Sequence, residues 1–367
     1  MSVEERELTN WRKKMYKSIS ANQELEKIPS LVLTPQEITE IKSLLSTITL
    51  EYSSVEDINF LNKATLFAQE LPRRIRETLN DFRLVEKNLS ACIISGYPIN
   101  DSKIGKTPMH WDSKTDKMHT LEEQILLVLY SSLLGDVFGW STQQDGYIIH
   151  DVFPIQKNEN DQIGTGSMQP IWWHTEDAFH PYRADYIGLM CLRNPEHVPT
   201  TISDLDVNQL SKAQVQILSE PNFIINLDES HQLKNRSSLK ESLQGENIDD
   251  TKSKININFQ EKVSLLFGSN QSPYLRIDPY FMDDIEDNQE IKSAFDELVD
   301  IIDKRVKLVT LKPGDICFID NYRSVHGRKP FKANYDGNDR WLKRINITKD
   351  LRKSRSVRSE STSRIIL

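Results

Sequence analysis

Residues 172–177 (WWHTED) carry side chains that can hold a metal ion. In a β-strand, residues two apart project from the same face, so His174 and Glu176 can offer an imidazole nitrogen and a carboxylate oxygen to one ion. A second histidine must come from a distant segment. His326 is the best candidate, because it follows a strand-like run at 316–319. Two histidines and one carboxylate form the facial ligand set of non-haem Fe(II) oxygenases, which leaves three coordination positions open.

A His-x-Glu pair alone is a weak signal in a chain with eight histidines, because most histidines are exposed or hydrogen-bonded in the core. Two arginines strengthen the metal-site prediction. Arg340 and Arg344 have the same parity in a strand-like run, so they share a face, and a buried pair of guanidinium groups needs carboxylate partners. If the two histidines were absent, the favoured interpretation of Arg340 and Arg344 would be two exposed arginines on an edge strand. We expect the other histidines to be structural or exposed: His110, His119, His150, His180, His197 and His231.

The string HTEDAFHPYRADYIGLMCLRN (174–194), with His326, Arg340 fourteen residues later and Arg344 eighteen later, resembles the clavaminate synthase-like branch of the Fe(II)/2-oxoglutarate-dependent oxygenases. It is most similar to the hydroxylases of free basic amino acids, L-lysine and L-arginine, from about residue 139 to 355. The resemblance implies Fe(II), 2-oxoglutarate as cosubstrate and O2. It also implies an α+β chain with a double-stranded β-helix (jelly-roll) core of two facing sheets.

The resemblance also implies roles for single residues. His174, Glu176 and His326 match the iron ligands and so the catalytic centre. Arg340 matches the arginine that binds the distal carboxylate of 2-oxoglutarate, and Thr201, with Thr200 beside it, matches the hydroxyl that supports it.

The substrate side is implied in the same way. Arg344 would hold the α-carboxylate of the amino acid, and Gln143 or Gln144 its α-amino group with help from Glu176. Ser167 is a weaker match, since a loop hydroxyl in a Gly-rich turn is as good an interpretation.

The substrate head group depends on residues 274–284. A guanidinium is best held by two carboxylates, whereas a lysine ammonium is satisfied by one carboxylate and neutral acceptors. This region offers Asp278 but has Tyr280 where the arginine hydroxylases would have a second acid. We therefore predict an L-lysine hydroxylase acting at C4 or C3, with an L-arginine 3-hydroxylase as the alternative. Asp283 and Asp284 could still serve arginine, and Asp278 could be a simple turn residue before Pro279.

Two other classes of protein remain open from the residues alone. A zinc hydrolase could use the same three ligands with a bound water, but it would have no use for two arginines facing the site. A non-catalytic jelly-roll binding protein would lack a complete ligand set.

Composition narrows the partners. The chain has 367 residues, is 38% hydrophobic and 27% charged, and carries a net charge of −8, so a nucleic-acid or anionic-membrane surface is disfavoured and a small-molecule amino-acid substrate is expected. Three widely spaced cysteines indicate neither a disulfide framework nor a thiolate zinc site, and they fit a reducing cytoplasm. We see no signal peptide and no membrane span. The oligomeric state stays open.

The elements that must position the site fall into a helical first part and a strand-rich remainder of one domain. Residues 1–138 are expected to be a mainly helical support region, with a capping box at 34–37 and amphipathic stretches at about 55–82 and 121–134. Residues 139–348 are expected to form the core, with helices packed outside it. A polar insert at 229–256 resembles a lid, and 349–367 is a basic tail. Short strands are expected at 147–153, 186–192, 222–227, 274–277, 316–319 and 341–348.

Overall fold

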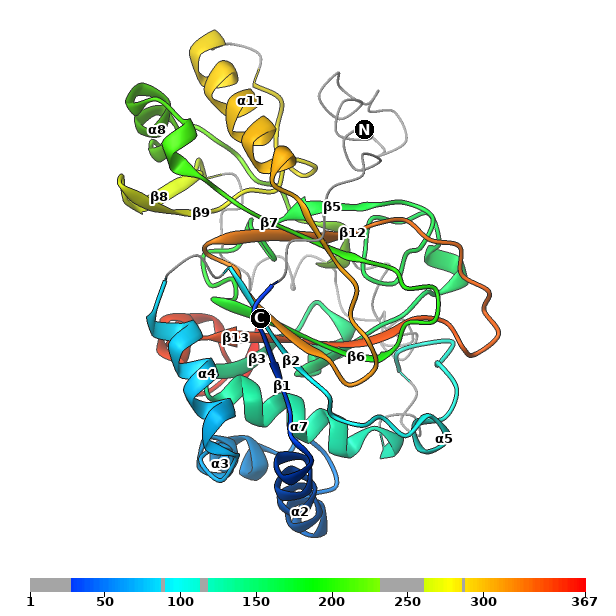
Figure 1. Cartoon of the computed structure of the whole chain (residues 1–367). Coiled ribbons are helices and arrows are strands. Elements are labelled where there is room, and N and C mark those ends of the chain that lie inside the picture. Colours follow the sequence, from blue (N-terminus) through cyan, green and yellow to red (C-terminus); the bar gives the residue numbers. More distant parts are fainter. Residues whose placement is uncertain (1–27, 87–89, 113–117, 232–260, 286–287) are drawn as a thin grey trace.

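A computed structural model describes residues 28–86, 90–112, 118–231, 261–285 and 288–367 (Figure 1). Two sheets lie one above the other, and the site lies between them. The larger sheet has the order β1 (Ser30–Val32), β2 (Ala91–Ser95), β11 (Ile316–Asp320), β6 (Tyr186–Arg193), β13 (Trp341–Thr348), β3 (Asp136–Trp140) and β14 (Ile365–Ile366), and β4 (Ile149–Val152) pairs with β13. The smaller sheet has the order β10 (Lys307–Val309), β7 (Thr200–Asp204), β12 (Ser324–Arg328) and β5 (Ile171–His174).

The chain moves repeatedly between the two sheets. It runs from β5 in the small sheet to β6 in the large one, returns to β7, and later passes from β10 to β11, β12 and β13 in the same alternating way. The pairs in this central part are antiparallel. Every residue of β6 is buried, because both faces of the large sheet are covered. A third pair of strands, β8 (Leu266–Ser269) and β9 (Ser272–Leu275), forms a separate hairpin.

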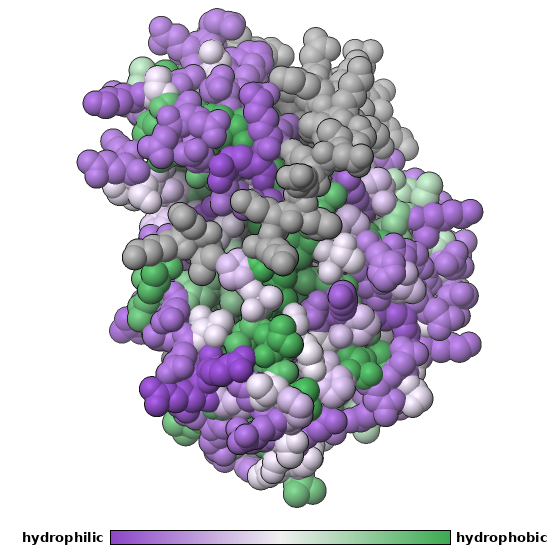
Figure 2. Space-filling view, viewed as in Figure 1, coloured by the Kyte–Doolittle hydropathy of each residue, from purple (hydrophilic) through white to green (hydrophobic). Residues whose placement is uncertain are grey.

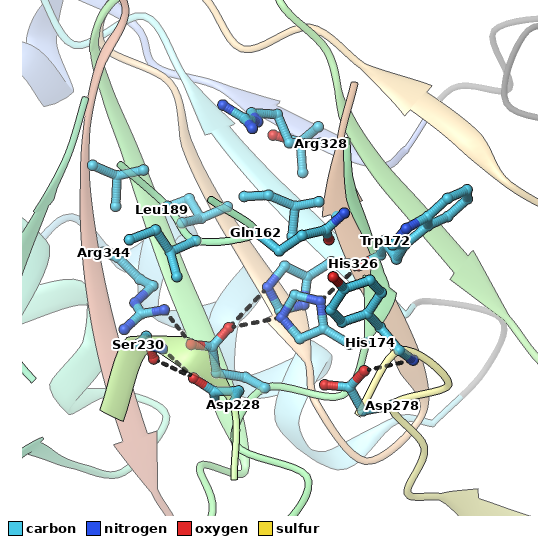
Figure 3. A pocket seen from close by; sticks show the side chains of 18 of the residues that line it. Gln162, Trp172, His174, Leu189, Asp228, Ser230, Asp278, His326, Arg328 and Arg344 are labelled. Atoms are coloured by element: carbon cyan, nitrogen blue, oxygen red, sulfur yellow. Dashed lines mark hydrogen bonds and ion pairs between the residues drawn. The ribbon is translucent and has the colours of Figure 1, made fainter. Parts of the chain in front are cut away.

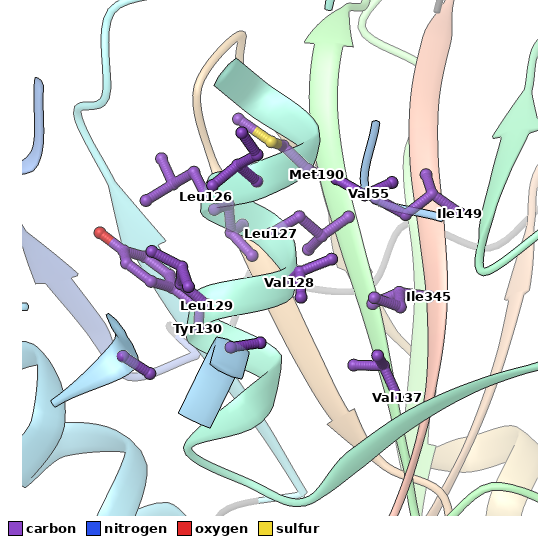
Figure 4. Packing of buried hydrophobic residues seen from close by; sticks show 14 of the residues in the cluster. Val55, Leu126, Leu127, Val128, Leu129, Tyr130, Val137, Ile149, Met190 and Ile345 are labelled. Carbon is purple, nitrogen blue, oxygen red and sulfur yellow. The ribbon is translucent and has the colours of Figure 1, made fainter. Parts of the chain in front are cut away.

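The large sheet is covered on its outer face by helices of the first part of the chain (Figure 1). These helices are α2 (Pro35–Glu51), α3 (Ile58–Ala68), α4 (Arg73–Leu84), the short α5 (Asp101–Ile104) and α7 (Leu121–Ser132). The innermost helix, α7, packs Leu127 and Val128 toward Val137, Ile149 and Ile345 of the sheet (Figure 4). Burial of this apolar surface fixes the outer side of the strands that carry the site.

The capping box predicted at 34–37 is present. The Glu37 N–H donates to Thr34 Oγ1 (3.2 Å), and the Thr34 N–H donates to the Glu37 carboxylate (2.7 Å). The stretch predicted at 55–82 is two helices instead of one, because Pro72 interrupts the pattern and becomes the N-cap of α4. The support region 1–138 also supplies β1, β2 and the start of β3.

Two further helices cover the small sheet, although helices were expected mainly in the first part of the chain. They are α8 (Lys212–Ser219) and α11 (Gln289–Lys304), and their outer surface is mostly hydrophilic (Figure 2). The buried positions of α11 recur at helical spacing, Ala294, Leu298 and Ile301 among them.

Most of the predicted strands are present with shifted ends, but the run at 222–227 makes only isolated bridges, Phe223 to Val263 and Ile225 to Met282. In the tail, Leu351–Val357 forms a short helix and β14 pairs with β3. Of the insert at 229–256, only Glu229–His231, a single 3-10 turn, belongs to the described residues, and the remainder lies outside them. Cys92, Cys191 and Cys317 are free and buried. No helix in the described part of the chain has both the length and the apolarity to cross a bilayer.

Candidate active site

The three predicted metal ligands meet between the sheets (Figure 3). Strands β5 and β12 are paired so that His174 lies opposite His326. The Nε2 atoms of His174 and His326 lie 3.5 Å and 3.2 Å from Oε2 of Glu176, and one ligand atom from each residue lies within 4.8 Å of the others. A single ion could therefore be held by two imidazoles and one carboxylate, the donor set that suits Fe(II) in oxygenases.

A glycine makes this pairing of strands possible. A Cβ added at Gly327 would lie 2.4 Å from the carbonyl oxygen of Ile171, which is closer than real Cβ contacts allow. Gly327 therefore lets β12 approach β5 closely, and this brings His326 opposite His174.

Glu176 reaches the site from a turn and not from the strand, which corrects the parity argument. Strand β5 ends at His174, and Asp177 has a φ of 51°. The buried amide of Asn321 holds the turn: the Glu176 N–H donates to Asn321 Oδ1 (2.8 Å), and Asn321 Nδ2 donates to the Glu176 carbonyl (3.1 Å). Asn321 thus positions the backbone of Glu176, one of the three predicted metal ligands. The sequence analysis missed this contact.

Burial alone would lower the pKa of His174, but its hydrogen bond to Glu176 and the charge of Asp278 raise that pKa to about 9, so an ion would have to displace a proton from this imidazole. His174 Nδ1 lies 2.8 Å from the Trp172 carbonyl oxygen and donates to it, so Nε2 is the nitrogen that would give up its proton to an ion. The other two ligand groups already favour the protonation states that metal binding needs. Burial lowers the pKa of His326 and so favours its neutral form. Burial alone would raise the pKa of Glu176, but the Arg344 guanidinium and the two histidines hold it well below its usual range.

The two oxygens of Glu176 face different partners. Oε2 faces the histidines, whereas Oε1 forms an ion pair with Nη1 of Arg344. Nη2 of Arg344 donates to Gln143 Oε1 (2.9 Å) and to Nδ1 of His150 (2.8 Å), its cross-strand neighbour. Arg344 and Gln143 thus lie together beside the metal-type ligands. His150, which we expected to be structural or exposed, is a buried partner of this arginine.

Gln144 makes its side-chain hydrogen bonds with a different partner. Its side chain is bonded to the main chain of Asp151, with Nε2 donating to the carbonyl (2.8 Å) and Oε1 accepting from the N–H (2.9 Å). Of the two adjacent glutamines, Gln143 is the one beside Arg344.

Arg340 lines the cavity with an exposure of only 4%. Within the described ranges, its guanidinium has no ion-pair partner, and its Nε has no hydrogen-bond partner. Burial lowers its pKa to about 10. Arg328 also lines the cavity, and its two Nη atoms donate to the carbonyl oxygens of Gly166 and Gln169. Burial and the charge of Arg340 lower the pKa of Arg328 to about 9. This part of the cavity is therefore suited to an anion.

Thr201 does not face the cavity, which corrects the prediction by one position. Thr201 lies opposite Gly327, and Ile202 lies opposite His326, whose side chain points to the site. Residues two apart share a face, so Thr200 faces the cavity with Ile202, and Thr200 is among its lining residues.

Ser167 is also outside the cavity lining. It is fully buried, and its hydroxyl lies 3.4 Å from the hydroxyl of Tyr335. It belongs to the loop whose Gly166 carbonyl accepts from Arg328, so its place is structural.

Two carboxylates lie at the end of the cavity away from Arg328 (Figure 3). Asp278 is buried, its Oδ1 accepts from the N–H of Tyr280 (3.2 Å), and burial, with repulsion from Asp228, raises its pKa to about 6. Asp228, the second, was missed by the sequence analysis. It accepts from the N–H (2.8 Å) and hydroxyl (2.5 Å) of Ser230, which also lines the cavity.

Comparisons with known proteins agree with this geometry. Residues 128–346 match the family described as "Taurine catabolism dioxygenase TauD, TfdA family". The chain is 42% identical over 340 residues to the enduracididine beta-hydroxylase of Streptomyces hygroscopicus (92% of this chain, 99% of the relative). It is 40% identical over 342 residues to the L-ornithine/L-arginine 3-hydroxylase of Catenulispora acidiphila, with the same coverage.

The L-lysine 3-hydroxylase of the same organism is more distant, at 27% identity (90% of this chain, 86% of the relative). Among solved structures, the non-heme iron oxygenase OrfP in complex with Fe, succinate and (3S)-hydroxy-L-Arg superimposes with a TM-score of 0.86 at 42% identity, covering 92% of this chain and 100% of that one. OrfP has also been solved with Fe and alpha-ketoglutaric acid, and with Fe and L-Arg.

Proposed function

The chain belongs to the TauD/TfdA family of dioxygenases, and from that premise we propose that it hydroxylates free L-arginine, or a closely related guanidino amino acid, at C3. The reaction would depend on Fe(II), 2-oxoglutarate and O2. The observation that carries the choice of substrate is the pair of carboxylates, Asp228 and Asp278, at one end of a cavity that holds the three metal-type ligands.

His174, Glu176 and His326 would hold the iron. Bound iron with 2-oxoglutarate and O2 would supply an oxidant strong enough for an aliphatic C–H bond, chemistry that no side chain can provide. Glu176 can bind an ion through Oε2 while Oε1 keeps its ion pair with Arg344, because the two oxygens face different partners.

The cosubstrate would lie toward Arg340. A buried guanidinium without a carboxylate partner in the described chain is the feature that an added carboxylate would satisfy, and a planar guanidinium binds a carboxylate bidentately. Thr200, on the same face of the small sheet as His326, would support this contact in place of Thr201.

The amino acid would lie on the other side of the metal ligands. Arg344 would hold its α-carboxylate, and Gln143 with Glu176 its α-amino group. Asp228 and Asp278 would share the guanidinium, since a planar fork with five N–H donors is best satisfied by two carboxylates.

Arginine therefore replaces lysine as the first choice, and C3 replaces C4. The lysine prediction depended on Tyr280 standing where a second acid was expected, but the second acid of this cavity comes from Asp228, about fifty residues earlier in the chain. The relatives named as enduracididine beta-hydroxylase and L-ornithine/L-arginine 3-hydroxylase are 40–42% identical, against 27% for the L-lysine 3-hydroxylase.

The same proposal covers the architecture. The two facing sheets, between which the chain alternates, would form a double-stranded β-helix (jelly roll). The described chain would be one oxygenase domain, because β1 and β2 from the first part and β14 from the tail all belong to the large sheet. A zinc hydrolase would have no use for Arg340 in the cavity, and a non-catalytic binding protein would have no use for the complete set of His174, Glu176 and His326.

The test is mass spectrometry of the free protein amino acids, with L-ornithine and enduracididine added, incubated with enzyme, Fe(II), ascorbate and 2-oxoglutarate. We expect one oxygen to be added to L-arginine at C3, with succinate formed in equal amount, and His326→Ala as the inactive control. Preference for L-lysine, or for a neutral amino acid, would refute the substrate assignment, and turnover without 2-oxoglutarate would refute the reaction class.

A further inference from the structure

A buried polar network lies behind the metal-type ligands and does not itself line the cavity. Nε2 of His231 lies 2.9 Å from Oδ1 of Asp177, and the side chains of both residues are at most 3% exposed. Asp177 Oδ2 accepts from Nε1 of Trp140 (2.6 Å), and Nδ1 of His231 lies 2.6 Å from the hydroxyl of Thr142. The ring of His231 also packs against Phe179, with centroids 4.9 Å apart. Both ring nitrogens of His231 thus have partners, and its Nε2 also lies 3.0 Å from Nε2 of Gln143 and 3.8 Å from Oδ2 of Asp228.

The network reaches the cavity through the turn that contains His231. Ser230, the residue before His231, accepts from Nε2 of Gln143 (2.5 Å) and donates to Asp228. Two successive residues of the turn, Ser230 and His231, are therefore hydrogen-bonded to Gln143 and Thr142. Asp228 lies three residues before His231 and lines the cavity, whereas His231 and Asp177 do not. His231 can therefore act on the substrate end of the cavity through Asp228, which it reaches both by the direct 3.8 Å contact of its Nε2 with Oδ2 and by this short segment, and it also lies beside Gln143.

We propose that the His231–Asp177 pair is the anchor that holds Asp228 against the guanidinium of the substrate, so that His231 and Asp177 are positioning residues for head-group selectivity. The inference rests on the function proposed above. A buried pair whose polar atoms all have partners allows one arrangement of the segment that carries it, because any other leaves a buried polar group unsatisfied.

Without the anchor, Asp228 loses its contact with Nε2 of His231, keeps its hydrogen bonds from Ser230 and can move out of its place. A substrate charge then meets one fixed carboxylate, Asp278, in place of two. Recognition of a guanidinium falls, while the site at Arg340 and the metal ligands keep their own contacts. L-Citrulline, whose neutral ureido group has the shape of a guanidinium, gains little from Asp228 and so loses little with the anchor.

The experiment compares kcat/KM for L-arginine and L-citrulline in wild type, His231→Phe and Asp228→Asn. Phe keeps the ring packing but removes the polar contacts of both imidazole nitrogens, to Thr142, Gln143 and Asp177. We expect His231→Phe to lower the arginine-to-citrulline ratio by on the order of tenfold or more, through KM for arginine, and to leave KM for 2-oxoglutarate nearly unchanged. His231→Gln can still donate toward Asp177, so its arginine-to-citrulline ratio should lie between those of His231→Phe and wild type. The exposed control, His197→Asn, should have the wild-type ratio.

A double-mutant cycle supplies the readout that a merely structural role would not move. If His231 acts through Asp228, then adding His231→Phe to Asp228→Asn changes the ratio little beyond Asp228→Asn alone. The inference would be overturned if the effects of the two substitutions on the ratio multiply in the double variant. It would also be overturned if His231→Phe raises KM for 2-oxoglutarate as much as KM for arginine. If His231→Phe does not fold, Thr142→Val removes only the contact to Nδ1 and is held to the same criteria.

The wild-type enzyme separates this inference from the proposed function. A wild type that prefers arginine, with a His231→Phe variant that keeps the full preference, overturns the inference alone. A wild type without a preference for arginine over citrulline overturns both.

Discussion

Replacing Arg340 by methionine should have two effects of opposite sign, because its guanidinium is buried without a carboxylate partner in the described structure. The variant should be more stable than wild type when no ligand is bound, and it should need far more 2-oxoglutarate for turnover. An ordinary core arginine paired to the protein would lose stability on the same substitution.

The magnitudes follow from burial. Burial lowers the pKa of Arg340 to about 10, and at 1.36 kcal/mol per pKa unit its charged form is penalised by about 3 kcal/mol. For a base with a lowered pKa in the fold, this penalty is present in full below about pH 10 and is lost gradually as the pH rises from there toward the higher pKa of the unfolded chain. Methionine removes the penalty, less the packing lost with a shorter side chain. The contact with the distal carboxylate is worth about 2–5 kcal/mol, or roughly thirty-fold to several thousand-fold in the KM for 2-oxoglutarate.

Two assays check the two signs. In thermal unfolding without ligand, Arg340→Met should have a melting temperature above that of wild type, by a few degrees at most. Anaerobic addition of 2-oxoglutarate to the iron-loaded protein should stabilise wild type but not Arg340→Met. Succinate formation gives the KM. Arg352→Met, at an arginine whose side chain is 89% exposed, is the matched control and should change neither. An unchanged requirement for 2-oxoglutarate, or a ligand-free variant that melts far below wild type, would show that Arg340 serves the fold and not the cosubstrate.

The remaining predictions concern the metal ligands and the carboxylate end. His326→Ala should lose both stoichiometric Fe(II) and turnover, as measured by metal analysis and succinate formation, and retention of either would remove it from the ligand set. Asn321→Ala should weaken Fe(II) binding by about 10–100-fold through the turn that carries Glu176, and a metal titration with unchanged affinity would contradict this. Because burial raises the pKa of Asp278 to about 6, the free enzyme loses this negative charge as the pH falls through about 6. We therefore expect kcat/KM for L-arginine to fall there while that for L-citrulline holds, and equal pH profiles with iron retained would count against Asp278 as a cation contact.

The metal ligands could be predicted from residue types and spacing, although the reason given was partly wrong. A strand of alternating faces was expected to place Glu176 with His174, but β5 ends at His174 and a turn held by Asn321 completes the placement. Residues two apart can meet at a strand end as well as within a strand. The pattern therefore predicts which residues meet but not the backbone that brings them together.

The error at Thr201 has a different cause. Adjacent residues of a strand face opposite sides, and only the pairing with a neighbouring strand decides which side is the interior. Here the register of β7 with β12 determines that Thr200 faces the interior, and this register cannot be derived from a single sequence. For α11 the signal was present, since its apolar residues recur at helical spacing, but the strand-like runs on either side drew the interpretation away from a helix.

The comparisons favour the arginine alternative over the lysine prediction, and the residue that separates the two, Asp228, is the one whose surroundings in the sequence say least. Asp228 stands at the start of a polar segment, where an acidic residue is normally a solvated one. It becomes half-buried beside Asp278 because His231, three residues later, fits between Thr142 and Asp177. In the function proposed here, head-group selectivity thus depends on contacts among segments separated by tens of residues. A count of acids near Asp278 finds one carboxylate, whereas the folded cavity has two, and this difference separates an ammonium from a guanidinium as the ligand.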